Sequence, residues 1–98
     1  MVRHIVFWNL KEEADGRGKW DNAKLMKEKL ESLVGQVEGL RRAEVGFNFT
    51  EGGYDVSLVA EHDSREALAV YQKHPAHLAV KEFVHKVICA RAVCDCEL

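Results

Sequence analysis

A tyrosine and two histidines lie within the segment Tyr71-Gln72-Lys73-His74-Pro75-Ala76-His77, which contains the only proline of the chain. Proline suits the first turn of a helix and keeps the residue before it out of helical geometry, so we expect a corner between two helices here. His77 then lies at the positive end of the second helix, where a neutral ring is favoured. Such a ring can remove a proton, and the Tyr71 hydroxyl can donate a hydrogen bond to an oxyanion. The pair is a candidate acid–base site. The alternative is a corner whose side chains only cap and pack.

His4 is the third candidate, because it alternates with Val6 on one face of a strand expected over residues 2–10. A lone histidine on a largely apolar face is commonly a buried structural group. If that face meets the helices instead, His4 converges with Tyr71 and His77. It would then orient a substrate or the base.

The elements that must position these side chains follow from the hydrophobic periodicity. A turn is expected at 51–53, Gly35 is expected to end the first helix, and Asp63 with Glu66 resembles a capping box. The expected elements are strands at 2–10, 40–50, 54–61 and 88–97, a helix at 19–34, a helical region from 63 to 87 with the corner at Pro75, and a loop at 11–18. The order strand–helix–strand–strand–helix–strand predicts a ferredoxin-like α+β fold with an antiparallel sheet.

The first strand is apolar on both faces, with Val6 and Trp8 on one and Ile5 and Phe7 on the other. Helices cover only one face of such a sheet, and an uncovered apolar face is a large exposed patch. The simplest way to bury it is against the same face of a second copy, which predicts a homodimer. A smaller sheet with a polar rim would allow a monomer.

The composition describes a globular chain, for which we expect one domain over residues 1–98. Hydrophobic residues make up 47% and charged residues 31%, with a formal charge of −2 and both signs interspersed. This pattern gives no indication of a nucleic-acid or membrane partner. No apolar run approaches the roughly 20 residues of a membrane span, and no secretory signal is evident. We therefore expect a cytoplasmic protein.

The three cysteines are an odd number, and all would be free thiols in a reducing compartment. Cys94 and Cys96 share one strand face and are expected to act as small buried hydrophobes, the alternative being a disulfide or metal pair. No third or fourth ligand has a convincing spacing, so no metal site is expected, and no haem or other cofactor signal is present. His62 and His85 are expected at the surface, and Trp8 and Trp20 in the core.

Several short motifs share their pattern with a known family. They are Arg3-His4-Ile5-Val6, Val45-Gly46-Phe47-Asn48, Tyr54-Asp55-Val56-Ser57-Leu58, the Tyr71–His77 segment and Arg91-Ala92-Val93-Cys94-Asp95. With these motifs the chain resembles the stress-responsive A/B barrel (Dabb) family of the dimeric α/β-barrel superfamily, over residues 1–97. The resemblance implies a homodimer whose two sheets form a barrel, with a pocket between sheet and helices in each subunit.

The Tyr-x-x-His-Pro-x-His pattern also resembles that of a plant polyketide cyclase of this family. The resemblance implies that His77 is the base of an aldol-type ring closure, that Tyr71 donates to the carbonyl or oxyanion, and that His4 belongs to the pocket. A further pocket histidine of that enzyme falls near Val56 here, which departs from the pattern. The pocket would bind a small apolar or polyketide-like ligand, with His4, His74, Trp8 and Phe83 as ligand-binding residues. The alternative is a non-catalytic dimer whose function is its stability or its assembly.

Overall fold

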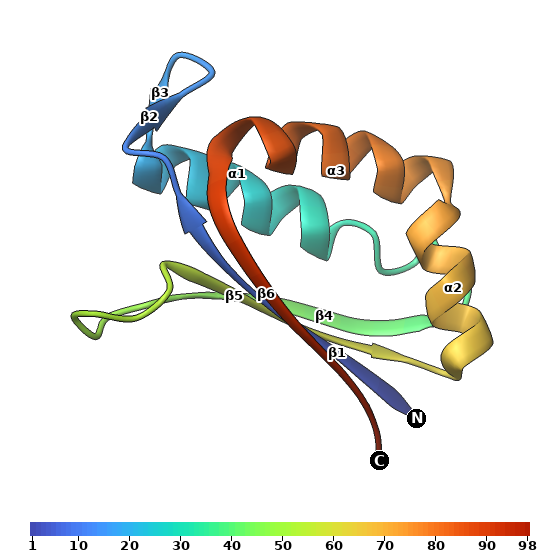
Figure 1. The fold of residues 1–98 in the computed structure, drawn as a ribbon. Helices are drawn as coiled ribbons and strands as arrows, with labels where there is room; N and C mark the ends of the chain where they lie inside the picture. Colours follow the sequence, from blue (N-terminus) through green and yellow to red (C-terminus); the bar gives the residue numbers. More distant parts are fainter.

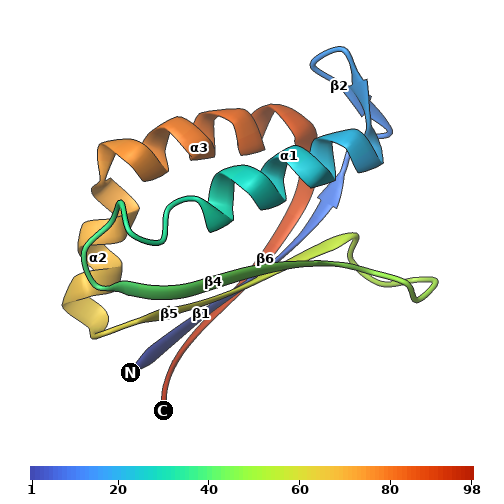
Figure 2. The same cartoon turned by 180° about the vertical axis from the view of Figure 1, so that it is seen from behind.

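The computed structural model describes residues 1–98 as two layers, a four-stranded antiparallel sheet and helices that cover one of its faces (Figures 1 and 2). The strand order is β4-β5-β1-β6, which confirms the expected ferredoxin-like α+β fold. In chain order the elements are β1 (Val2–Leu10), β2 (Glu13–Ala14), β3 (Arg17–Gly18), α1 (Lys19–Glu31), β4 (Leu40–Phe47), β5 (Val56–His62), α2 (Arg65–Lys73), α3 (Pro75–Val87) and β6 (Ile88–Glu97). None of the three helices has the length and apolar composition that a membrane span requires.

Strand β1 is central in the sheet and places every second side chain against the helices. Its helix-facing residues, from Val2 through His4 to Leu10, are buried. Helices α1 and α3 lie side by side over this face (Figure 1). The core therefore lies between the sheet and the helices, and His4 belongs to it.

The predicted corner between two helices is confirmed. Helix α2 ends at Lys73, and His74 has an extended backbone with φ −66° and ψ 135°. Pro75 is then the first residue of α3. An N–H group at this position would have no partner within the helix, so the helix loses no hydrogen bond to proline. The His74 Nδ1 accepts a hydrogen bond from the backbone N–H of Ala76 at 3.0 Å, so this ring caps the new helix.

The start of α2 differs from the predicted capping box. The N-cap is Ser64, whose hydroxyl oxygen accepts a hydrogen bond from the Ala67 N–H at 3.0 Å. The Asp63 carboxylate instead forms two hydrogen bonds with the Arg41 guanidinium, at 2.6 and 2.9 Å. Because Asp63 is paired with Arg41 of the neighbouring strand β4, it does not cap α2.

The segment between α1 and β4 contacts α2 at Gly39. Gly39 has φ +88°, a conformation that side chains other than glycine rarely adopt. A Cβ atom on Gly39 would lie only 2.8 Å from the Cβ of Ala67 in α2. The Gly39 carbonyl also accepts the Asp63 N–H at 2.9 Å. Gly39 therefore permits a close contact that fixes the start of α2.

Three further expectations near α1 are wrong. The predicted loop at 11–18 contains the short β2–β3 hairpin, and the predicted helix at 19–34 ends at Glu31. Trp20 is 47% exposed and contacts Phe47 edge-on, with 6.4 Å between ring centroids. It lies at the start of α1, so it does not reach the core.

The second face of the sheet carries no helix (Figure 2). On β1 this open face carries Ile5 and Phe7, which alternate with the buried residues. Their partners on the neighbouring strands lie on the same face, namely Val59, Ala92 and Cys94. Cys89 and Cys94 are exposed and Cys96 is half-buried. The expectation of buried cysteines is wrong for the single chain, because β6 is an edge strand and Cys94 and Cys96 lie on the open face.

Candidate functional site

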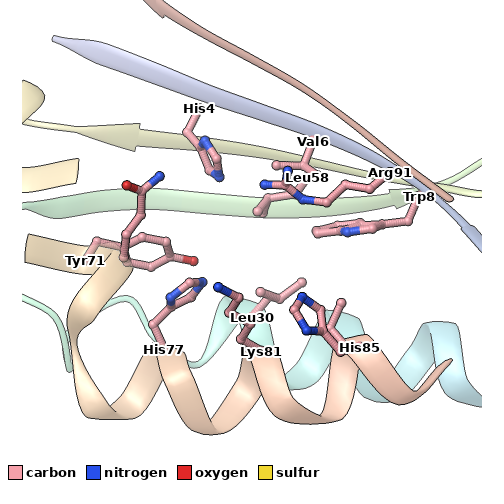
Figure 3. Close-up of a pocket in the computed structure, with 12 residues that line it drawn as sticks. His4, Val6, Trp8, Leu30, Leu58, Tyr71, His77, Lys81, His85 and Arg91 are labelled. Carbon is pink, nitrogen blue, oxygen red and sulfur yellow. The ribbon is translucent and has the colours of Figure 1, made fainter. Parts of the chain in front are cut away.

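A pocket of about 340 Å³ lies between the helix-facing side of the sheet and the helices (Figure 3). Its wall is apolar in part, and histidine, tyrosine, glutamine and basic side chains supply the rest. The twelve lining residues are His4, Val6, Trp8, Leu30, Leu58, Tyr71, Gln72, His77, Lys81, Val84, His85 and Arg91. The sequence candidates Tyr71, His77, His4 and Trp8 are thus brought together in one pocket.

Tyr71 and His77 form the closest aromatic pair of the site. Tyr71 lies in the last turns of α2 and is 2% exposed, whereas His77 lies in the first turn of α3. Their ring centroids are 4.2 Å apart, with 35° between the ring planes. The corner at His74–Pro75 makes this contact, because it turns the chain back between the two residues.

Burial holds both groups of this pair in their neutral forms at neutral pH. It raises the pKa of Tyr71 to about 12, so the phenol keeps its proton and remains a hydrogen-bond donor. Burial also lowers the pKa of His77, and the positive charges of Lys81 and Arg91 act in the same direction. His77 is therefore an unprotonated imidazole that can accept a proton, next to a phenol that can donate one.

His4 faces the pair from the sheet. The residue is 5% exposed, and its Nδ1 is hydrogen-bonded to the carboxylate of Asp95, the residue opposite it on β6. The ring centroids of His4 and Tyr71 are 6.4 Å apart. With Nδ1 donating to the carboxylate, the ring orientation is fixed and Nε2 remains for a ligand. Asp95 was not among the sequence candidates, and only the β1–β6 register reveals it.

His62 was expected at the surface, and this is wrong. It is the last residue of β5, faces the helices, and is 0% exposed. Its ring centroid lies 4.8 Å from that of Tyr71 and 6.2 Å from that of His4. Burial, with a smaller effect of the nearby His4, lowers the pKa of His62 to about 4, so the ring is neutral. It supports the Tyr71 ring from behind the pocket lining.

The open end of the pocket carries basic groups. Lys81 and His85 follow His77 along one face of α3 at intervals of four residues, and Arg91 projects from β6 opposite Trp8 (Figure 3). His85 is exposed as expected, yet it also lines the pocket. The spacing of eight residues from His77, two intervals of four on one helix face, was the sequence signal that would have placed it there.

His74 and Phe83, the other two expected ligand-binding residues, lie outside the pocket lining. His74 caps α3, as described above. The Phe83 ring lies under the Arg17 guanidinium and the Lys29 ammonium, at 5.7 and 5.2 Å from its centroid. No three His, Cys, Asp or Glu side chains come together as a set of metal ligands.

An antiparallel sheet with helices on one face and a pocket between the layers defines a ferredoxin-like α+β protein. The chain belongs to the Dabb family, since the model of the stress responsive A/B barrel domain matches residues 2–98. No curated protein has a sequence close enough to match.

Solved structures with the same fold include proteins of three kinds. A dimeric ferredoxin-like protein of unknown function from Bacteroides fragilis has 28% identity and a TM-score of 0.88, over 99% of this chain and 95% of its own. A Dabb-family protein from Mesorhizobium loti has 18% identity and a TM-score of 0.78, over 99% and 95%. A hydroxynitrile lyase from Passiflora edulis has 17% identity and a TM-score of 0.79, over 96% and 89%.

Proposed function

We propose that this protein is a homodimer in which each subunit uses its pocket for acid–base chemistry on a small carbonyl compound. The observation that carries the proposal is the Tyr71–His77 pair. A neutral imidazole and a protonated phenol, 4.2 Å apart between ring centroids, line one pocket. An unprotonated base beside a proton donor is the combination that enolate chemistry requires.

In the proposed reaction His77 removes a proton from a carbon next to the substrate carbonyl. The electron pair of that C–H bond becomes the enolate, whose oxygen accepts a hydrogen bond from the Tyr71 hydroxyl. His4, held by Asp95, orients the substrate. In a polyketide-cyclase-like closure the enolate carbon attacks a second carbonyl of the same molecule, and the new alkoxide takes back the proton from His77. One carbon–carbon bond forms, and no redox cofactor takes part.

The hydroxynitrile lyase with this fold supports the reaction class. Its name describes cleavage of a hydroxynitrile, which also changes a carbon–carbon bond next to an oxygen. The shared fold does not transfer a substrate. It shows that this architecture supports lyase chemistry in another protein.

The proposal of a homodimer is based on the open face of the sheet. Ile5, Phe7 and Val59 are partly exposed there, and a second copy would cover them. The Bacteroides fragilis protein is described as dimeric. Light scattering at micromolar concentration should give twice the mass of the chain, and a monomer would refute this part.

The chemistry is tested with 5-nitrobenzisoxazole, an apolar probe whose ring opens to a coloured phenolate when a base removes its C–H proton. We expect His77→Gln to lower the rate by about 100-fold and Tyr71→Phe by at least about tenfold. The wild-type rate should rise with pH and reach its plateau below the usual titration range of histidine, because burial lowers the pKa of His77.

His74→Asn is the matched control, since asparagine also caps a helix and His74 lies outside the pocket. It should leave the rate unchanged. Equal rates for wild type and His77→Gln, together with a large loss of thermal stability in that variant, would favour the alternative of a non-catalytic dimer with a structural histidine.

A further inference from the structure

The lining of the pocket has a charge opposite to that of the chain as a whole. None of the twelve lining residues is acidic, and Lys81 and Arg91 give the lining two positive charges. The whole chain has a formal charge of −2. The lining therefore has a net positive charge, although acidic residues outnumber basic ones overall.

Neither cation has an ion partner within the chain. Lys81 and Arg91 take part in none of its ion pairs, whereas Arg41, Arg42 and Arg65 each bind a carboxylate at 2.6–2.7 Å. The two free cations also belong to opposite walls, since Lys81 projects from α3 and Arg91 from β6. A ligand entering between the layers would pass between them.

The rest of the lining is arranged to hold an uncharged body. The apolar residues Val6, Leu30 and Leu58 lie deeper and are buried. His77 lies one helical turn from Lys81. Figure 3 shows Tyr71 and His77 at one end of the pocket, with Val6 and Leu58 between this pair and Trp8. The pocket thus combines an acid–base pair at one end, apolar residues in the middle and two cations, one on each wall.

We infer that the ligand is an organic carboxylate that also carries a carbonyl group and an apolar part. The carboxylate binds Arg91, whose planar fork fits two carboxylate oxygens, and Lys81 supplies a second positive group. The carbonyl then lies beside Tyr71 and His77, and the apolar part contacts Val6, Leu30 and Leu58. This inference rests on the proposed function and names the substrate class of the same pocket, an oxo acid.

The test compares two ligands of equal shape and different charge, 4-butylbenzoate and 4-butylbenzamide, by calorimetric titration at neutral pH and low salt. We expect the anion to bind about tenfold more tightly than the amide. High salt should weaken binding of the anion and leave the amide unaffected. The double variant Lys81→Gln/Arg91→Gln should lose the preference for the anion and still bind the amide.

The control is Lys24→Gln/Lys73→Gln, which removes the same charge from exposed residues outside the pocket. It should keep the preference. Equal affinity of wild type for both ligands, or a preference that survives in Lys81→Gln/Arg91→Gln, would overturn the carboxylate inference and leave the acid–base proposal standing. If wild type binds neither ligand and His77→Gln also keeps the full rate with 5-nitrobenzisoxazole, both proposals fail.

Discussion

Replacement of Gly39 by alanine should test how firmly the loop before β4 holds α2, the helix that carries Tyr71. The substitution adds two separate penalties. Alanine at φ +88° is strained by about 1–2 kcal/mol. The new Cβ also lies 2.8 Å from the Ala67 Cβ, and such overpacking costs about 1–3 kcal/mol. We therefore expect the free energy of unfolding to fall by about 2–5 kcal/mol.

The two penalties are separated by matched variants. Gly35 has a similar φ of +92°, but nothing lies within 4 Å of the Cβ position, so Gly35→Ala carries the strain alone. Ala67→Gly removes the atom that clashes, at a cost of about 1 kcal/mol for glycine in a helix. The double variant Gly39→Ala/Ala67→Gly should recover about 1–3 kcal/mol relative to the sum of the single changes.

Urea unfolding, followed by circular dichroism at one protein concentration, measures all four variants against wild type. Equal destabilisation by Gly39→Ala and Gly35→Ala, with no recovery in the double variant, would refute the argument. It would mean that the loop can move away from α2 without loss. The position of Tyr71 would then have to be fixed by the sheet and α3 alone.

Two other predictions concern the groups that support the pair. The folded protein disfavours protonation of His62, whose pKa is lowered from 6.5 to about 4, so stability should fall as pH drops through that interval, by an amount on the order of 3 kcal/mol. His62→Leu should flatten this slope in urea unfolding over a pH series, and parallel slopes would count against a buried neutral histidine. Asp95→Asn should lower the rate with 5-nitrobenzisoxazole by about tenfold, because His4 loses its carboxylate partner. The melting temperature should change little, since the Asp95 side chain is 40% exposed, and an unchanged rate would show that Asp95 does not position His4.

The fold and the contact between Tyr71 and His77 could be predicted because their signals are local. Hydrophobic periodicity showed the order of strands and helices, and Pro75 fixed the corner that brings Tyr71 to His77. The same local signal failed at Asp63, since the arginine that engages it lies on another strand. Local patterns thus identify elements and nearby contacts, but not which long-range partner a polar group finds.

The remaining parts of the site depend on strand register. His4 and Asp95 are far apart in the chain, and only the antiparallel pairing of β1 with β6 places them opposite each other. Arg91 faces Trp8 for the same reason. His62 looked like a surface residue because it ends a strand next to charged residues, yet its face of the sheet is covered by α2. Such placements follow from the packing of whole elements.

Some residues of the site come from one short segment of the chain and others from segments far apart in sequence, and this division has a consequence for how such proteins diversify. The proposed proton-transfer pair belongs to one short segment around the His74–Pro75 corner, whereas the groups proposed to recognise the ligand come from β1, α3 and β6. Substitutions in the recognising strands can therefore change the ligand without moving the pair. A scaffold of this kind keeps one reactive element and explores many substrates, so relatives with the same corner are expected to share a reaction type more often than a substrate.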